Sequence, residues 1–113
     1  MPTPMREPTF WILTALAPEA RHGYGVIRQV SQLSGGQVTL QAGTLYAALD
    51  RLAALGLVEP AQEEVIDGRP RRYYRLTSDG AAALEDETER RRASVAAASA
   101  QLSARRQLGL SLS

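Results

Sequence analysis

The chain of 113 residues contains no cysteine and no lysine, and only 5% of its residues are aromatic. Without cysteine there are no disulfides, no thiolate nucleophiles and few ways to build a zinc site, and this composition suits a reducing cytosol. The N-terminal segment has no apolar run of signal-peptide length, and no segment is long enough to cross a membrane. We therefore expect a cytoplasmic protein with no membrane partner.

The sequence also lacks the clusters that catalysis requires. Its single histidine, His22, stands at a glycine-rich helix start, where a capping or surface role is expected. No histidine–carboxylate cluster, glycine-rich phosphate loop or pair of catalytic acids is recognisable, and a metal site would have to combine carboxylates with one imidazole. We therefore predict no catalytic residue, no metal, no cofactor and no enzymatic activity.

Positive and negative charges nearly balance, with a net charge of +1, so the total does not indicate a nucleic-acid partner. The distribution is more informative, because all 13 basic residues are arginines and four of them fall within 69–75. This stretch follows Asp67–Gly68, the strongest short signal for a β-hairpin turn. The sequence therefore predicts a hairpin whose returning strand is rich in arginine.

Hydrophobic spacing and chain-breaking residues divide the sequence into three short helices, the hairpin and one long helix. The expected helices span about 9–17, 22–33, 42–56 and 78–107, and the expected strands span 57–63 and 71–76, with a short extended piece at 37–40. This order predicts a mainly α (α+β) fold. It would comprise a winged helix-turn-helix DNA-binding domain at 1–77, a C-terminal dimerisation helix at 78–108 and a frayed tail at 109–113.

The third helix has the composition of a recognition helix. Its outer face is narrow enough for the major groove, which is about 12 Å wide, and its N-terminal end favours phosphate. The residues that keep this face narrow are Gly43, Thr44, Ala47 and Ala48, and those that supply hydrogen-bonding groups are Gln41, Thr44 and Tyr46. An ordinary amphipathic core helix, buried through Leu45, Leu49, Leu52 and Ala53, is the alternative for this segment considered alone.

The hairpin carries cations at its tip and on its returning strand. Such an arm rests on the phosphate backbone or enters the minor groove, where arginine is favoured. The alternative is a solvated edge strand that uses charge to avoid aggregation, and Pro60 marks the first strand as an edge or bulged strand. We expect Arg69, Arg71 and Arg72 to contact DNA and Arg75, nearer the body of the domain, to be structural.

The long helix carries an imperfect heptad pattern that the small domain cannot bury alone, and we expect a second chain to cover it. The pattern consists of Leu84, Thr88, Arg91, Val95, Ala98 and Leu102. The charged block 85–92, which includes the helical pair Glu87–Arg91, is interpreted as a solvated face, with inter-subunit ion pairs as the alternative.

Two adjacent aromatic residues near the N-terminus point in different directions. Phe10 belongs to the apolar stripe of the first helix and is expected in the core, whereas Trp11 is left outside that stripe. An exposed tryptophan usually contacts a partner or a ligand. We expect Trp11 to pack on the long helix of a second subunit, with stacking of an effector as the alternative.

Three separated motifs, in the same order along residues 7–80, resemble the PadR family of bacterial transcriptional regulators. They are His22–Gly23–Tyr24–Gly25 in the second helix, Gly43–Thr44–Leu45–Tyr46 with Leu49, Arg51–Leu52 and Gly56–Leu57 in and after the third helix, and residues 68–77 in the hairpin. The single helix that follows resembles the subgroup with a short C-terminal region. The resemblance implies a homodimer, held by its C-terminal and first helices, that binds an inverted-repeat operator, usually as a repressor.

The resemblance also implies, for some members, release from DNA by phenolic acids or hydrophobic drugs. Because the long helix here contains no aromatic residue, an aromatic sandwich could draw only on first-helix residues such as Trp11. A winged-helix protein-interaction module and a DNA-binding architectural protein of low specificity are the alternative functions.

Three sets of site residues follow from these interpretations. The DNA-binding set is Tyr24, Gln41, Ala42, Gly43, Thr44, Tyr46, Arg51, Gly68, Arg69, Arg71 and Arg72. The dimer-interface set is Phe10, Leu84, Thr88, Arg91, Val95, Ala98 and Leu102, and the effector-binding residue is Trp11. The predicted partners are double-stranded DNA, a second copy of the chain and a small hydrophobic or aromatic effector.

Overall fold

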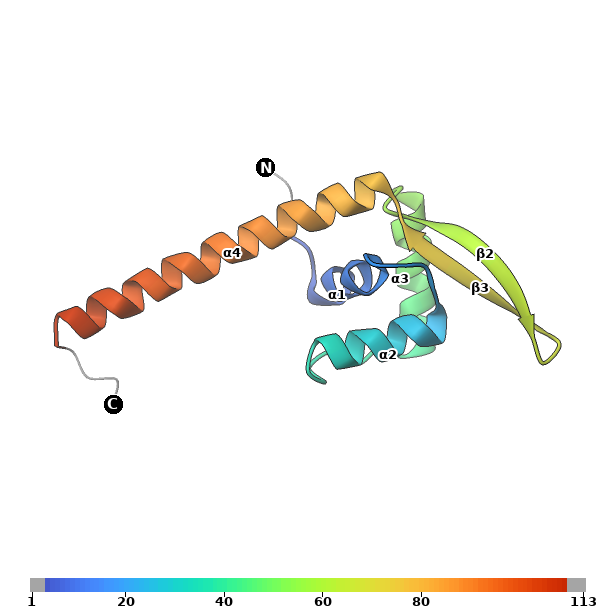
Figure 1. The fold of residues 1–113 in the computed structure, drawn as a ribbon, viewed down its shortest axis with the longest axis horizontal. Helices are drawn as coiled ribbons and strands as arrows, with labels where there is room; N and C mark the ends of the chain where they lie inside the picture. Colours follow the sequence, from blue (N-terminus) through green and yellow to red (C-terminus); the bar gives the residue numbers. More distant parts are fainter. Residues whose placement is uncertain (1–3, 110–113) are drawn as a thin grey trace.

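The computed structural model describes residues 4–109 and contains four helices and three strands within that range (Figure 1). In chain order these are α1 (Glu7–Leu16), β1 (Arg21–His22), α2 (Gly23–Leu33), α3 (Ala42–Ala54), β2 (Val58–Ile66), β3 (Arg69–Leu76) and α4 (Ser78–Gln107). The expected order of helices and hairpin is confirmed, and the fold is a winged helix-turn-helix. Strand β1 is an addition, and residues 37–40 form no strand.

Capping and glycine residues set the helix boundaries as the sequence predicts. The Nδ1 atom of His22 accepts a hydrogen bond from the backbone N–H of Gly25 at 3.2 Å, so His22 caps α2. The capping role expected for His22 is therefore confirmed. Gly56, immediately after α3, has a φ of 77°, a left-handed conformation that suits glycine and ends the helix.

The core lies among α1, α2 and α3, and the sheet closes one side of it. Its largest fully buried side chains are Ile12, Leu13, Leu16, Val26, Val30, Leu45, Leu49, Leu52 and Val58. Two expectations fail here. Ala48 lies in the core instead of on the outer face of α3. Phe10, expected in the core, is only half-buried, because Ile12 and Leu13 fill the core and the Phe10 ring lies against Arg91 of α4.

The sheet has the strand order β1–β3–β2, and both of its pairings are antiparallel. The β2–β3 hairpin, which we call the wing, turns at Asp67 and Gly68, whose φ angles of 51° and 75° are those of a type I′ turn. The register shifts between Pro60 and Glu63, and β2 is one of the two edge strands, as Pro60 predicted. Both strands extend closer to the turn than expected.

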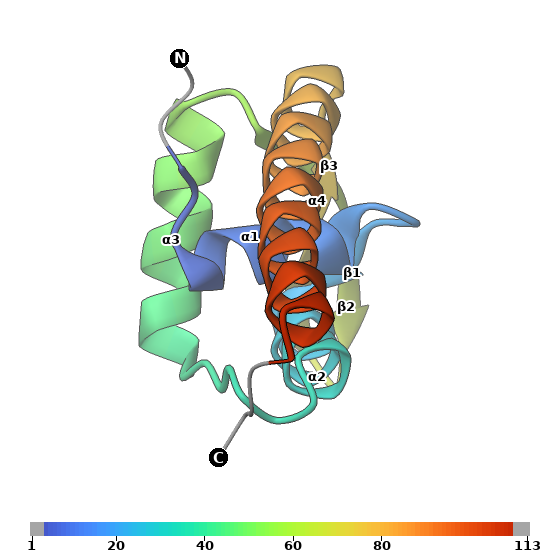
Figure 2. The ribbon, with the colours of Figure 1, turned by 90° about the vertical axis from the view of Figure 1, so that its left-hand side faces the viewer.

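Helix α4 leaves the domain as a single rod of 30 residues, about 45 Å long at 1.5 Å per residue. Thr77 caps it by accepting a hydrogen bond from the N–H of Gly80 at 3.0 Å. Helix α1 packs between α2 and the first half of α4, whereas residues 92–104 are exposed (Figure 1). Viewed from the free end of α4, α3 stands to one side of α1 and α4 (Figure 2).

No helix among residues 4–109 has the length and apolar character needed to cross a membrane. The frayed tail expected at 109–113 lies, apart from Gly109, outside the described residues.

Candidate nucleic-acid interface

The N-terminal half of α3 is open to solvent. Residues 41–44, 46 and 47 are exposed, while Leu45 is fully buried and holds this end of the helix on the core. The side chain of Gln41, the N-cap residue, makes no capping hydrogen bond. The first backbone N–H groups of α3 are therefore available to an acceptor outside the helix, in the region where the helix dipole favours an anion.

A groove of about 530 Å³ separates α3 and the start of α2 from the wing. Tyr24 and Tyr46 line it on the helical side, and Arg69, Arg71 and Arg72 line it on the wing side. Tyr24 is 74% exposed and Tyr46 is 46% exposed, so both residues are open to solvent. The structure thus brings together five of the predicted DNA-binding residues, which lie on three separate elements.

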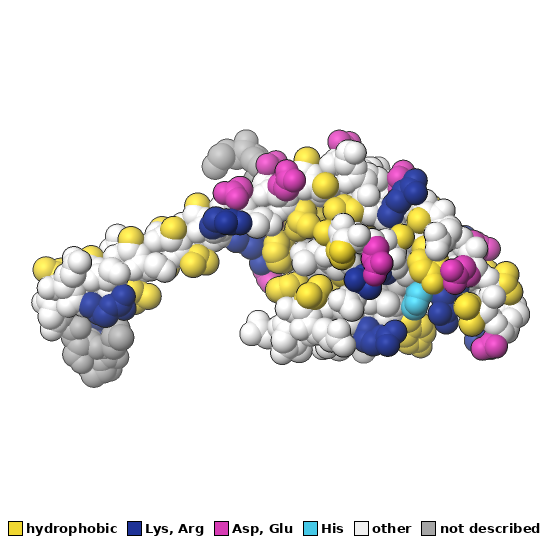
Figure 3. Space-filling model, viewed as in Figure 1, with side chains coloured by type: hydrophobic (Ala, Val, Ile, Leu, Met, Phe, Trp, Pro, Cys, Tyr) yellow, Lys and Arg dark blue, Asp and Glu magenta, His cyan; other side chains and the backbone are white. Residues whose placement is uncertain are grey.

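The wing carries no net charge, because its four arginines are matched by Glu59, Glu63, Glu64 and Asp67. Opposite charges face each other across the two strands, because Arg75, Arg72 and Arg71 of β3 lie in register with Glu59, Glu63 and Glu64 of β2. Figure 3 shows basic and acidic side chains interspersed over this part of the surface. The number of arginines alone therefore overstates the positive potential of the wing.

The cross-strand pairs differ in closeness. Arg75 Nε lies 2.8 Å from Glu59 Oε1, consistent with the structural role expected for Arg75, whereas Arg72 Nε is 4.0 Å from Glu63 Oε2. Arg69 lies in register with Ile66, next to the turn. Within residues 4–109 neither Arg69 nor Arg71 has a carboxylate within 4.0 Å. These two arginines are the wing cations best placed to pair with an outside anion.

His22 links the wing to α2. It pairs with Tyr73 in the β1–β3 ladder, and the two rings meet edge to face with centroids 5.3 Å apart. Tyr73 in turn donates a hydrogen bond to Glu64 on β2 at 3.2 Å. Burial, with the nearby Arg71 and Arg28, lowers the pKa of His22, which favours the neutral imidazole needed to accept the Gly25 hydrogen bond. The two-residue strand β1, which the sequence did not predict, brings His22 next to Tyr73.

A second hollow, of about 470 Å³, lies on another side of α3, against the start of α1. It is lined by Gly43, Thr44 and Arg51 from α3 and by Arg6 and Thr9 beside them. Arg51 donates a hydrogen bond to the Thr9 hydroxyl at 3.2 Å. Predicted DNA-binding residues on α3 are thus divided between two faces of the helix, and Arg51 lies in the hollow away from the wing.

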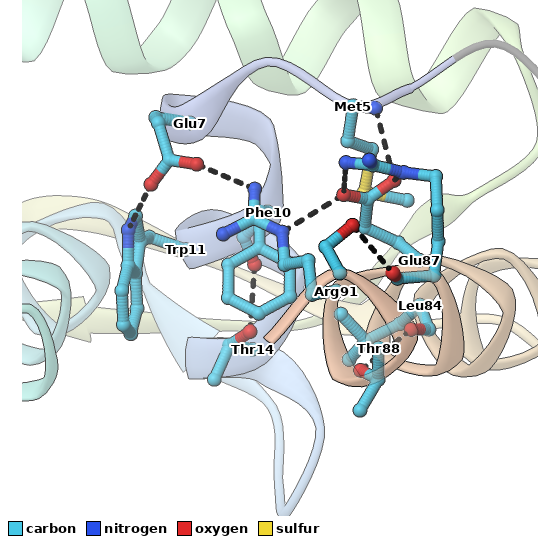
Figure 4. Close-up of polar contacts among 11 residues, drawn as sticks. Met5, Glu7, Phe10, Trp11, Thr14, Leu84, Glu87, Thr88 and Arg91 are labelled. Atoms are coloured by element: carbon cyan, nitrogen blue, oxygen red, sulfur yellow. Dashed lines mark hydrogen bonds and ion pairs between the residues drawn. The ribbon is translucent and has the colours of Figure 1, made fainter. Parts of the chain in front are cut away.

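The contact between α1 and α4 centres on a buried carboxylate, Glu87 (Figure 4). Glu87 is 5% exposed and accepts hydrogen bonds from the Met5 backbone N–H at 3.1 Å, from Arg90 Nε at 3.1 Å and from Arg91 Nε at 2.8 Å. The two guanidinium groups lower the pKa of Glu87 to about 2. The Glu87–Arg91 pair is confirmed, but the interpretation of 85–92 as a solvated face is wrong at Glu87.

Arg91 continues this network onto α1. Its guanidinium lies 2.6 Å from Glu7 Oε1 and 3.7 Å above the centre of the Phe10 ring (Figure 4). The hydrogen bond from Arg91 lowers the pKa of Glu7. Trp11, expected to be exposed, is half-buried because it packs against the core. Its indole N–H donates a hydrogen bond to Glu7 at 3.1 Å, and its ring meets the Phe10 ring edge to face.

The predicted dimer-interface residues fall into two groups. Within one chain, Arg91 of α4 contacts Phe10 of α1, Leu84 packs against the core, and Thr88 is half-buried. Val95, Ala98 and Leu102 are exposed on the free half of α4, with Val95 66% exposed. The dimer interface itself stays a prediction.

The model of the Transcriptional regulator PadR-like family matches residues 12–86, which include the core, the wing and the start of α4. The chain belongs to this family. It is 44% identical over 82 residues to the transcriptional regulator Rv3488 of Mycobacterium tuberculosis, an alignment that covers 73% of this chain and 70% of the relative. PadR-family membership therefore supports a regulator of transcription, and not an enzyme.

Solved structures show the same fold. A PadR family transcription regulator from Clostridium difficile R20291 superposes with a TM-score of 0.69 at 27% identity, covering 83% of this chain and 96% of that one. Bacillus subtilis PadR, solved in complex with operator DNA, gives a TM-score of 0.64 at 21% identity, covering 72% of this chain and 46% of that one.

Proposed function

We propose that this PadR-family protein is a homodimeric repressor that binds an inverted-repeat operator. In this proposal the open N-terminal half of α3 enters the major groove, and Tyr46 and Thr44 meet base edges there. Arg69 and Arg71 of the wing meet the flanking phosphates, and Tyr24 at the start of α2 meets the backbone on the other side of the groove.

One observation supports this proposal above the others. The groove beside α3 is bordered by two exposed tyrosines and by two wing arginines that have no carboxylate within 4.0 Å among the described residues. A binding partner that offers both anionic groups and hydrogen-bonding edges would complement this surface. Duplex DNA offers both, as phosphates and as base edges.

Pairing of two chains is proposed along the free half of α4. Val95, Ala98 and Leu102 form an apolar row on this half, which Figure 3 shows extending away from the rest of the molecule. An isolated helix segment gains most of its stability from packing an apolar face. A second copy of the same row would cover it, and the two-fold symmetry of the pair would suit an operator whose half-sites lie one helical turn of DNA apart, about 34–36 Å.

The proposal is tested by selecting bound duplexes from a random pool and measuring Kd for the selected sequence by fluorescence anisotropy. We expect a palindromic consensus and an affinity for it about 10³-fold or more above that for random duplex. Equal affinity for both duplexes would instead support a low-specificity architectural protein, and no affinity for any duplex would support a protein-interaction module. Sedimentation velocity reports the number of chains per complex.

We also propose that a small hydrophobic or aromatic effector releases the protein from DNA, and that this effector binds beside Trp11 at the α1–α4 contact. The half-buried indole and the neighbouring Phe10 ring offer an apolar surface there. Titration of aromatic and amphiphilic compounds while recording Trp11, the single tryptophan, by fluorescence tests this step. Compounds that shift the emission are expected to raise the Kd for the operator, and an unchanged emission with every compound would contradict the effector site.

A further inference from the structure

Polar contacts attach helix α4 to the winged helix at two places, with the half-buried Leu84 packed on the core between them, and the first of these places is the N-terminus of α4. The Thr77 N–H donates to the Leu57 carbonyl at 3.1 Å, and the Thr77 hydroxyl donates to the Gly56 carbonyl at 2.6 Å. Gly80, on the first turn, is buried directly against the Leu57 carbonyl. These contacts fix where α4 begins, but a single point does not fix its direction.

The second attachment is the Glu87 cluster, defined as Glu87 and Arg91 of α4 with Met5, Glu7 and Phe10. It joins α4 to α1 and to the residues before α1 through one N–H···carboxylate bond, one ion pair between Arg91 and Glu7, and one cation–ring contact. A second ion pair, between Glu87 and Arg91 within α4, holds the Arg91 guanidinium in place. These partners are separated by up to 82 residues in sequence, so the cluster fixes the orientation of α4 relative to the domain. Figure 4 shows the Glu7 and Glu87 carboxylates on either side of Arg91.

The spacing of the two attachments makes α4 a lever. Gly80 and the Glu87 cluster are about 10–16 Å apart along the helix, whereas the end of α4 lies about 40 Å from Gly80. Residues 92–104 are exposed, so the described part of the chain provides no later support for them. A shift of about 1 Å at the cluster would therefore move the free end by about 3 Å, close to the 3.4 Å rise of one base pair.

We propose that the Glu87 cluster determines which spacing between operator half-sites the dimer accepts. The inference rests on the proposed function, because dimer pairing through the free half of α4 is what connects the direction of α4 to the distance between the two α3 helices. Glu87 contacts no DNA in this arrangement. It is a positioning residue, and it acts on the separation of the two reading helices while leaving each helix's own surface unchanged.

The test uses the full chain and a series of duplexes in which the two selected half-sites are separated by spacers that differ by one base pair. Glu87→Gln keeps the shape of the side chain and its carbonyl acceptor for Met5, but it removes the charge that holds Arg91. Glu7→Gln, on the surface of α1, removes the other partner of Arg91 and remains informative if Glu87→Gln fails to fold. Glu89→Gln removes one charge from an exposed residue of the same helix and is the matched control.

Wild type and Glu89→Gln are expected to share one preferred spacer. For Glu87→Gln and Glu7→Gln, the preferred spacer is expected to move by one base pair or the preference over neighbouring spacers to fall by about threefold or more. Affinity for a duplex with a single half-site should stay within about twofold of wild type. A folded variant with the wild-type spacer profile would overturn the inference, as would an equal loss at every spacer and at the single half-site. Failure of wild type to bind any selected duplex would instead overturn the proposed function.

Discussion

The ring of Tyr46 on α3 lies against the backbone of Gly23, the first residue of α2. A Cβ atom at Gly23 would overlap the Tyr46 hydroxyl and would lie 2.8 Å from Cζ. The φ angle of Gly23 is not in the left-handed region, so its backbone conformation does not require glycine. The position requires glycine because a side chain would collide with Tyr46. The two helices of the helix-turn-helix thus meet at a residue predicted to touch DNA.

Gly23→Ala is expected to push the Tyr46 ring out of its present position, because the hydroxyl end can move while the backbone of α3 cannot. If Tyr46 meets a base edge, discrimination between the selected operator and its single-base variants should fall by about tenfold. Anisotropy titrations with a panel of such duplexes measure this ratio.

Gly25→Ala is the matched control for that experiment. A Cβ atom there would lie 3.6 Å from its nearest neighbours, an ordinary contact. Because alanine also favours a helix, Gly25→Ala should stabilise the fold by roughly 0.5–1 kcal/mol and leave discrimination unchanged. Equal discrimination by both variants would contradict a role for Tyr46 in base recognition.

Gly80→Ala should destabilise the fold, because a Cβ atom at this position would overlap the backbone carbonyl of Leu57 and lie 2.7 Å from Leu76 Cδ1. Backbone cannot move aside as a flexible side chain does, so we expect a loss of about 1–3 kcal/mol in the free energy of unfolding, measured with urea. Gly43→Ala provides the comparison, since nothing lies within 4 Å of its Cβ. That variant should gain roughly 0.5–1 kcal/mol, and similar values for the two would show that α4 does not need its close approach to Leu57.

Acid should weaken the link between α2 and the wing through His22. Burial lowers the pKa of His22 in the folded protein, so the unfolded chain binds the proton more readily. The stabilising contribution is therefore complete above the unfolded pKa of about 6.5 and declines as the pH falls toward the folded value. Urea titrations from pH 7.5 to pH 5 should show this decline.

His22→Asn separates this effect from other acid-sensitive groups. Asparagine is a good N-cap residue and does not titrate in this range, so it should keep α2 capped and flatten the dependence of unfolding free energy on pH. An identical pH dependence in wild type and His22→Asn would assign the decline to another group.

The wing arginines should differ in their contribution to the salt dependence of DNA binding. Arg69→Ala is expected to reduce the slope of log Kd against log salt by about 0.9 if one phosphate contact is lost. Arg75→Ala should leave the slope unchanged, because Arg75 is paired with Glu59 at 2.8 Å. An unchanged slope in Arg69→Ala and Arg71→Ala would place the wing outside the DNA interface.

Local signals predicted much of this fold. The Asp67–Gly68 turn, the Thr77 and His22 caps and the Gly56 stop each depend on one or two residues and their immediate backbone. Strand β1 escaped prediction because two residues cannot show alternation, and its pairing partners lie more than 50 positions away.

The site was less predictable where distant partners decide the outcome. Glu87 has the sequence context of a solvated helix residue, and its burial depends on the Met5 N–H and on α1. The four arginines close together in the sequence predicted a basic wing. Their pairing with the glutamates of β2 depends on the register of the two strands, which is a property of the folded hairpin. Long-range register and burial are tertiary properties that local patterns do not encode.

The division of α4 near Arg91 has a consequence for how such a protein can diversify. The residues up to Arg91 are committed to the winged helix of their own chain, whereas residues 92–104 are free of it. If two chains pair through the free segment as proposed, substitutions there would alter which copy, paralogue or engineered chain is bound without disturbing the fold that carries α3. In the proposed dimer, residues that attach α4 to its own domain and residues that pair with the second chain therefore occupy separate stretches of one helix, and each stretch can change independently of the other.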